Sequence, residues 1–195
     1  MRIAILGLYR SGSSVTAEIL YNLGVNMGAP FFREYYESSR LADKLRIWWR
    51  EPLLEESVAK EERIKYLKTW LIEEESKGIK WIGAKHPLLA ACPSDLIDAW
   101  GEVKFIWAYR DLDRSISSSL LKFNWQKEVA ERIQRELWKS ISGFLGERDY
   151  LKIVFSDYWK NPSGQVNKLI DYLGLAPSSE QMERAYGCIK PISET

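Results

Sequence analysis

The stretch GLYRSGSS, residues 7–14, limits most strongly what this chain can fold into. Two glycines, Gly7 and Gly12, are separated by four residues, and the apolar run RIAILG leads into them. A helical pattern follows over residues 13–23 and ends at Gly24. A glycine loop between a strand and a helix turns backbone N–H groups toward an anion. The sequence therefore predicts that this loop binds a phosphate or a sulfate group.

The cation of this loop is an arginine. Enzymes that bind ATP or GTP keep a lysine after the second glycine, but Ser13 stands there in this chain. Arg10, inside the loop, is the candidate replacement. Taken alone, two glycines at this spacing are a weak motif, and an ordinary turn with a solvated arginine is the alternative.

Four apolar runs that do not alternate with polar residues predict strands buried on both faces. They cover residues 2–7, 79–84, 103–109 and 151–155. Helical patterns follow these runs over residues 55–77, 94–100, 126–145, 161–174 and 178–186. This alternation predicts an α/β fold: a three-layer sandwich with a central parallel β-sheet, similar to P-loop NTPases, in one domain over residues 1–195.

Ligands of such folds collect where the strands end. We therefore expect the stretches GLYRSGSS, AKHP, YRD and SDYW to share a cleft.

Composition narrows the partners and the location. The formal net charge is +1, so the overall charge favours neither nucleic acid nor an anionic membrane as a partner. Cys92 and Cys188 have neither the spacing of metal ligands nor that of a disulfide framework, which predicts a cytoplasmic protein. The N-terminal apolar run is too short for a spanning helix and has no signal-peptide pattern.

A second candidate anion site follows the third predicted strand. In YRDLDRSISSSLL, Arg110 ends the strand and Ser118 lies eight residues later, about two turns into the next helix. An arginine and a serine that converge from these positions can bind a second phosphate. The alternative is a helix start capped by Asp111 or Asp113, with Ser118 on the surface.

With both stretches in view, the chain resembles the sulfotransferases that use 3′-phosphoadenosine 5′-phosphosulfate (PAPS). GLYRSGSS resembles the family's 5′-phosphosulfate loop, and YRDLDRSISSSLL resembles its 3′-phosphate site. GAKHPLL, residues 83–89, is similar to the family's segment beside the reacting sulfate. Residues 156–175, SDYWKNPSGQVNKLIDYLGL, are similar to its C-terminal motif.

The resemblance implies sulfuryl transfer from PAPS to a hydroxyl or amine of a small-molecule or glycan acceptor, without a metal. The residues that it assigns to donor binding are Arg10, Ser11, Gly12, Ser13, Ser14, Arg110 and Ser118. It assigns catalysis to Arg10, Lys85 and His86. The base stays open between His86, the only histidine, and the carboxylates Glu34 and Glu37.

The chain also departs from the family pattern. Ser156 stands where many relatives have a tyrosine that stacks on adenine, and Lys190 is the candidate cation of a shortened C-terminal loop. Six aromatic residues between the first helix and the charged helix suit a lid or the core better than an acceptor pocket: Phe31, Phe32, Tyr35, Tyr36, Trp48 and Trp49.

Two other functions remain open from the sequence. One is a nucleotide kinase or NTPase in which Asp157 binds magnesium. The other is a nucleotide-binding protein without catalytic activity.

Overall fold

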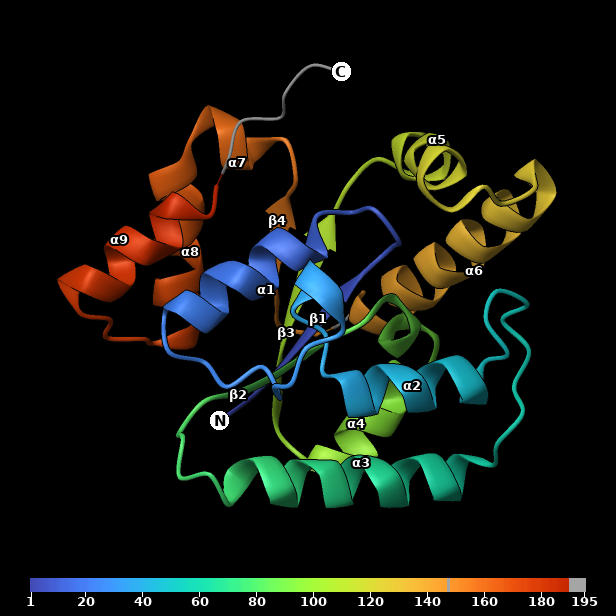
Figure 1. Ribbon diagram of the computed structural model, residues 1–195, viewed down its shortest axis with the longest axis horizontal. Coiled ribbons are helices and arrows are strands. Elements are labelled where there is room, and N and C mark those ends of the chain that lie inside the picture. The colour runs from blue at the N-terminus through green and yellow to red at the C-terminus, as the bar shows by residue number, and fades with distance from the viewer. Residues whose placement is uncertain (147, 190–195) are drawn as a thin grey trace.

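The computed structural model describes residues 1–146 and 148–189 (Figure 1). Four parallel strands form one sheet in the order β2-β1-β3-β4. The strands are β1 (Arg2–Gly7), β2 (Ile82–Lys85), β3 (Val103–Tyr109) and β4 (Tyr150–Val154). The predicted α/β class with a parallel sheet is confirmed.

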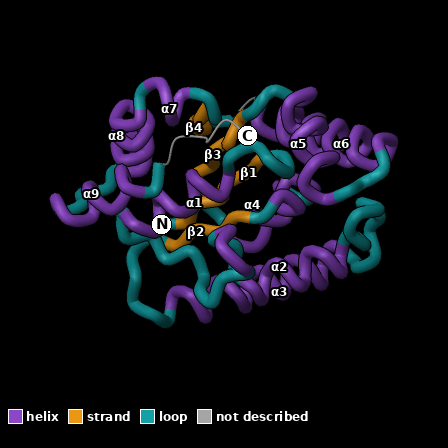
Figure 2. Tube along the Cα trace, turned by 45° about the horizontal axis from the view of Figure 1, so that its top comes forward, coloured by secondary structure: helices purple, strands orange, loops and turns teal. Residues whose placement is uncertain are grey.

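Helices cover both faces of this sheet, as Figures 1 and 2 show. Ile3 and Ile5 of β1 pack on one face against α1 (Ser13–Asn22), α7 (Asp157–Lys160), α8 (Pro162–Leu173) and α9 (Ser179–Gly187). Ala4 and Leu6 pack on the other face against α2 (Ser39–Trp48), α3 (Lys60–Glu75), α4 (Pro93–Trp100) and α6 (Lys127–Leu145). Successive strand residues point to opposite faces, so a strand covered on both sides is apolar throughout.

The remaining elements lie at the carboxyl edge of the sheet. Helix α5 (Leu112–Phe123) follows β3, and two short 3-10 helices are η1 (Arg33–Tyr35) and η2 (Pro87–Ala91). In the sheet register, Ile5 lies between Lys85 of β2 and Ile106 of β3. Strands β1, β2 and β3 therefore end near one another, which brings the segments that follow them together.

The helix boundaries show where local contacts outweigh sequence periodicity. The helix predicted over residues 55–77 begins only at Lys60. Before it, Ser57 donates from Oγ to the carbonyl oxygen of Ile47 at 2.6 Å and from its backbone N to that of Trp48 at 2.8 Å. These bonds hold the preceding residues as a loop against the end of α2, a helix that the prediction omitted. Strand β2 likewise begins at Ile82 rather than at residue 79.

Several predicted caps are confirmed. Asn161 accepts a hydrogen bond from the N–H of Gly164, and Ser178 forms a capping box with Gln181. Asp111 caps α5 by accepting from the N–H groups of Asp113 and Arg114. In the described part of the chain, no helix combines the length and the apolarity needed to cross a membrane. The cytoplasmic location stays a prediction.

Candidate functional site

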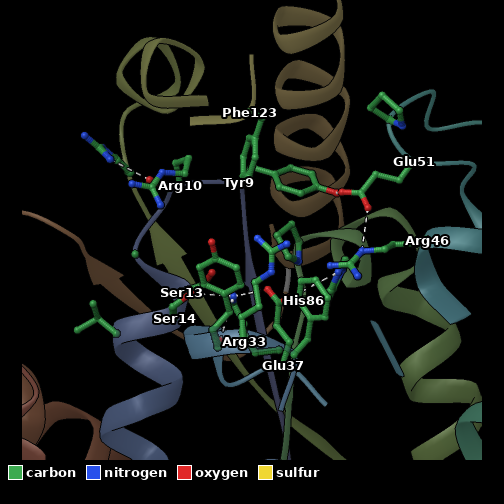
Figure 3. A pocket seen from close by; sticks show the side chains of 18 of the residues that line it. Tyr9, Arg10, Ser13, Ser14, Arg33, Glu37, Arg46, Glu51, His86 and Phe123 are labelled. Carbon is green, nitrogen blue, oxygen red and sulfur yellow. Dashed lines mark hydrogen bonds and ion pairs between the residues drawn. The ribbon is translucent and has the colours of Figure 1, made fainter. Parts of the chain in front are cut away.

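A cavity of about 570 Å³ opens at the carboxyl edge of the sheet (Figure 3). Three of the four stretches predicted to share a cleft supply lining residues: the glycine loop, the segment after β2 and the end of β3. The fourth stretch, SDYW, does not line the cavity, but Phe155 immediately before it does. The segment from Phe32 to Pro52 and the end of α5 complete the wall.

Neighbouring atoms lie close to both glycines of the loop. Gly12 has φ +87°, and a Cβ at this position would lie 2.0 Å from the Phe155 ring. A Cβ on Gly7 would lie 2.5 Å from Ser11 Oγ and 3.0 Å from the carbonyl oxygen of Ala108. The loop can therefore follow this path only with glycine at position 12, whereas a Cβ at position 7 would displace the Ser11 side chain.

The N-terminus of α1 is open to a ligand. Gly12 is its N-cap, no side chain caps it, and its first turn contains no acidic residue. The first N–H groups of a helix have no partner inside it, and the helix dipole adds partial positive charge. Ser13 and Ser14 line the cavity at this end. Ser11, also predicted to bind the donor, is buried and does not line the cavity, and its Oγ has no hydrogen-bond partner among the described residues. These features suit an anion.

Arg10, Arg110 and Ser118 form one cluster beside the loop. Arg10 Nε donates to Ser118 Oγ at 3.2 Å, and an Arg110 side-chain nitrogen donates to the backbone oxygen of Arg10 at 2.9 Å. The Arg110 guanidinium also lies 4.9 Å from the centre of the Phe155 ring. Burial, together with the charges of Arg10 and Arg114, lowers the pKa of Arg110. Among the described residues, neither Arg10 nor Arg110 forms an ion pair with a carboxylate, so this cluster is a second place that suits an anion.

Lys85 and Glu37 form a buried ion pair at the floor of the cavity. Lys85 Nζ lies 2.5 Å from Glu37 Oε1 and donates to Ser14 Oγ at 3.0 Å. Burial lowers the pKa of Lys85, and Glu37 partly offsets this effect. The pair connects the end of β2 to the start of α1 and orients the Glu37 carboxylate.

His86 is buried beside this pair and is neutral. Its Nδ1 accepts a hydrogen bond of 3.1 Å from the N–H of Leu88, which leaves the imidazole proton on Nε2. Burial, then the charges of Lys85 and Arg46, hold the pKa of His86 well below its usual value. Nε2 lies 3.8 Å from Glu37 Oε2. In this arrangement neither ring nitrogen has a lone pair available for an incoming proton.

The opposite wall of the cavity is aromatic and contains a second carboxylate. The Tyr9 hydroxyl donates to Glu51 Oε1 at 2.6 Å, and Arg46 Nε donates to Glu51 Oε2 at 3.0 Å. Burial and the Glu51 charge raise the pKa of Tyr9. The ring centres of Tyr9 and Trp125 lie 5.1 Å apart, and those of Phe123 and Trp125 lie 4.8 Å apart.

One buried amide fastens the glycine loop to the helices behind it. Gln134 of α6 donates from Nε2 to the carbonyl oxygen of Tyr9 at 2.9 Å and to Ser119 Oγ at 2.7 Å. Ser119 lies next to Ser118 on α5. Gln134 therefore ties the start of the loop to the helix that presents Ser118.

Of the other predicted site residues, some line the cavity and some do not. Glu34 is exposed and does not line the cavity, whereas Glu37 is buried and does. Neither Ser156 nor Asp157 lines the cavity. Lys190 lies outside the described residues.

Of the aromatic residues expected in a lid or the core, Trp48 is in the core, and Phe31 and Tyr36 pack against Tyr21 of α1. Phe32 and Tyr35, in contrast, line the cavity.

Sequence reasoning missed part of the lining: Tyr9, Arg33, Arg46, Glu51, Pro52, Phe123, Trp125 and Phe155. A sequence signal exists for two of these residues, because Tyr9 lies inside the glycine loop and Phe155 directly follows an apolar strand. The others lie on segments whose approach to the loop depends on long-range packing.

A model of the sulfotransferase family matches residues 2–179. A search of curated protein sequences gives no match.

Solved structures share the fold. The sulfotransferase domain of the olefin synthase from Synechococcus PCC 7002 is similar, with a TM-score of 0.61, 16% identity, and coverage of 94% of this chain and 77% of that chain. The sulfotransferase STF1 from Mycobacterium tuberculosis H37Rv has a TM-score of 0.60, 12% identity, and coverage of 95% and 73%. Retinol dehydratase, solved with androsterone and the inactive cofactor PAP, has a TM-score of 0.52, 16% identity, and coverage of 97% and 64%.

Proposed function

The chain belongs to the sulfotransferase family, an enzyme family that uses PAPS, and we propose that it transfers a sulfuryl group from PAPS to a hydroxyl or amine of a small-molecule acceptor. One observation carries the proposal. The uncapped start of α1, with Arg10, lies beside Arg110 and Ser118, so two places that suit anions adjoin each other. PAPS has anionic groups at both its 5′ and its 3′ end.

The donor residues fit such a ligand. The N–H groups at the start of α1 are donors beside the loop, and Ser13 and Ser14 lie at the same end of the cavity. These groups would hold the 5′-phosphosulfate. Arg110 and Ser118 would hold the 3′-phosphate through charge-assisted hydrogen bonds.

The catalytic roles follow from charge. PAPS supplies a sulfuryl group on a phosphate leaving group, on which negative charge grows during transfer. Arg10 would stabilise this charge from the loop. Lys85, which reaches Ser14 at 3.0 Å, would add positive charge from the end of β2. Donors fixed in place before the reaction need no reorganisation when the charge develops.

Among the three candidate bases, we propose Glu37. The partner of its Oε1 is Lys85, whereas Oε2 faces His86 at 3.8 Å, beyond hydrogen-bond distance. Oε2 would take the proton of the acceptor hydroxyl or amine. His86, neutral and with its Nδ1 already accepting from Leu88, would pack beside this carboxylate rather than remove the proton.

Thermal unfolding with nucleotides tests the donor site. The ligands are 3′-phosphoadenosine 5′-phosphate (PAP), AMP, ADP and ATP, each with and without magnesium. We expect PAP to raise the melting temperature most, without a need for magnesium, because it alone presents a 3′-phosphate. A ligand at a hundred times its Kd stabilises the folded state by about 2.7 kcal/mol.

A shift only with ATP and magnesium would instead support a kinase, and no shift with PAP would contradict the proposal. Turnover of PAPS to PAP with an acceptor panel then separates a transferase from a protein that only binds nucleotide.

A further inference from the structure

Arg33 is a cation of the cavity that the proposed donor site does not use. Five cationic side chains line the cavity: Arg10, Arg33, Arg46, Lys85 and Arg110. Arg10 and Arg110 belong to the two proposed donor positions, whereas Lys85 pairs with Glu37 and Arg46 pairs with Glu51. For Arg33, the described residues provide no carboxylate within ion-pair distance. Its charge is therefore available to a ligand.

The backbone holds Arg33 in an unfavourable conformation. Its φ is +51°, a left-handed region that arginine adopts at a cost in conformational energy. The surrounding loop is closed by a bridge between Phe31 and Ser38 and by a hydrogen bond of 2.7 Å from the N–H of Phe32 to the carbonyl oxygen of Glu37. Strain that a closed loop maintains is typical of functional positions.

The side chain of Arg33 points into the cavity, as Figure 3 shows. Its guanidinium carbon lies 5.3 Å from the centre of the Phe32 ring, and that of Arg46 lies 3.9 Å from the same centre. Phe32 thus holds two guanidinium groups at one wall. Because Glu51 neutralises Arg46, the two guanidinium groups beside Phe32 leave one net positive charge, that of Arg33.

The wall contributed by the end of α5 suits a flat apolar group. Phe123 and Trp125 stack at 4.8 Å, and Tyr9 meets both rings edge to face. All three rings line the same cavity as Arg33 and Glu37. The cavity therefore combines a carboxylate that can accept a proton, an aromatic wall and a cation that has no ion-pair partner in the part of the chain that the structure describes.

We infer that the acceptor is a hydroxylated aromatic acid, whose carboxylate binds Arg33 and whose ring packs on the aromatic wall while its hydroxyl faces Glu37. This inference rests on the proposed function, because it concerns the acceptor half of the same cavity. It goes further by naming the acceptor class. A guanidinium and a carboxylate form charge-assisted hydrogen bonds that a neutral amide cannot reproduce.

Matched acid and amide probes test this assignment. Protein saturated with PAP is titrated calorimetrically with 4-hydroxyphenylacetate and its amide, and with 3-hydroxybenzoate and its amide. We expect the acids to bind roughly tenfold more tightly than the amides. Arg33→Gln should abolish this preference, Arg33→Lys should retain part of it, and Arg33→Glu should reverse it. Arg132→Gln, at an exposed position on α6, removes the same charge elsewhere and should leave the preference intact.

The outcomes separate the two proposals. Failure of PAP itself to bind the wild-type protein would contradict the proposed function. Normal PAP binding without a preference for acids across both pairs, including no binding of any probe, would overturn the acceptor assignment alone. A loss of PAP affinity in Arg33→Gln would also overturn it, because Arg33 would then act on the donor.

Discussion

Arg10 Nε donates a hydrogen bond of 3.2 Å to Ser118 Oγ, across 108 positions of sequence. The contact joins the glycine loop after β1 to helix α5 after β3. It brings the side chain proposed to stabilise the leaving group into direct contact with the hydroxyl proposed to bind the 3′-phosphate. The two ends of the donor site are thus coupled through one guanidinium.

Arg10→Ala should lower kcat for sulfuryl transfer by about 10²-fold or more, because a fixed donor is lost where negative charge develops. The dissociation constant for PAP should change much less. Steady-state kinetics with PAPS, together with calorimetry with PAP, measures both quantities. Arg132→Gln serves as the charge-matched control, and an Arg10→Ala enzyme with unchanged kcat would remove Arg10 from the mechanism.

Arg110→Ala should weaken PAP binding by roughly 10-fold to 100-fold, since a charge-assisted hydrogen bond to phosphate contributes about 1.5–3 kcal/mol. AMP, which lacks the 3′-phosphate, should bind the variant and the wild type equally. Calorimetric titration with both nucleotides measures the difference. An equal loss of affinity for both would show that Arg110 does not distinguish the 3′-phosphate.

Glu37→Gln should lower kcat by about 10²-fold to 10⁴-fold if the carboxylate is the base. The PAP dissociation constant should stay close to that of the wild type, because this side chain belongs to the acceptor half. Steady-state kinetics with PAPS, together with calorimetry with PAP, measures both quantities. If Glu37→Gln keeps kcat and His86→Asn lowers it, the base is His86.

Gly12→Ala should destabilise the fold and abolish PAP binding. The left-handed backbone alone costs about 1–2 kcal/mol with a Cβ, and the clash with Phe155 adds to this cost. Urea unfolding measures the loss, and the double variant Gly12→Ala/Phe155→Ala should relieve the clash but not the backbone strain. Gly143→Ala, in α6 with no atom near its Cβ position, is the matched control and should not destabilise. Equal stability of Gly12→Ala and the wild type would contradict the prediction.

Stability should fall in mild acid because of His86. Its pKa in the folded state is well below the ordinary value of 6.5, so the unfolded chain binds the proton first as the pH decreases. Above pH 6.5, protonation of His86 does not lower the free energy of unfolding. Below that pH it removes up to about 1.4 kcal/mol of the free energy of unfolding per pH unit, until the folded pKa is reached.

The matched variant is His86→Asn, whose side-chain oxygen can accept the N–H of Leu88 in place of Nδ1. Since His86 is the only histidine, the variant should lose the part of the decline between pH 6.5 and 5.5 that carboxylates do not cause. Denaturant unfolding across that interval compares the two proteins. Parallel curves would show that His86 does not titrate as described.

The sequence predicts best what depends on the backbone and on near neighbours. The glycine loop, the four strands and the caps at Asn161 and Ser178 rest on local patterns, and the structure has them within a few residues. The omitted helix α2 also has a local pattern, with Leu41, Leu45 and Trp48 on its buried face.

The acceptor half of the cavity is harder to predict because its residues meet only through the tertiary fold. Glu51 reaches Tyr9 across 42 positions, and Phe123 packs on Tyr9 from the far end of α5. The choice between Glu34 and Glu37 likewise depends on which one the loop buries. Neither residue has a neighbour in sequence that would indicate this.

Gln134 has a consequence for how the donor site would recognise its ligand. From a buried position on α6, its amide donates hydrogen bonds to the Tyr9 carbonyl in the loop and to Ser119 on α5. Gln134 thereby fixes the distance between the two proposed phosphate positions. We expect such a site to select nucleotides by the spacing of their phosphates as well as by contacts with the base.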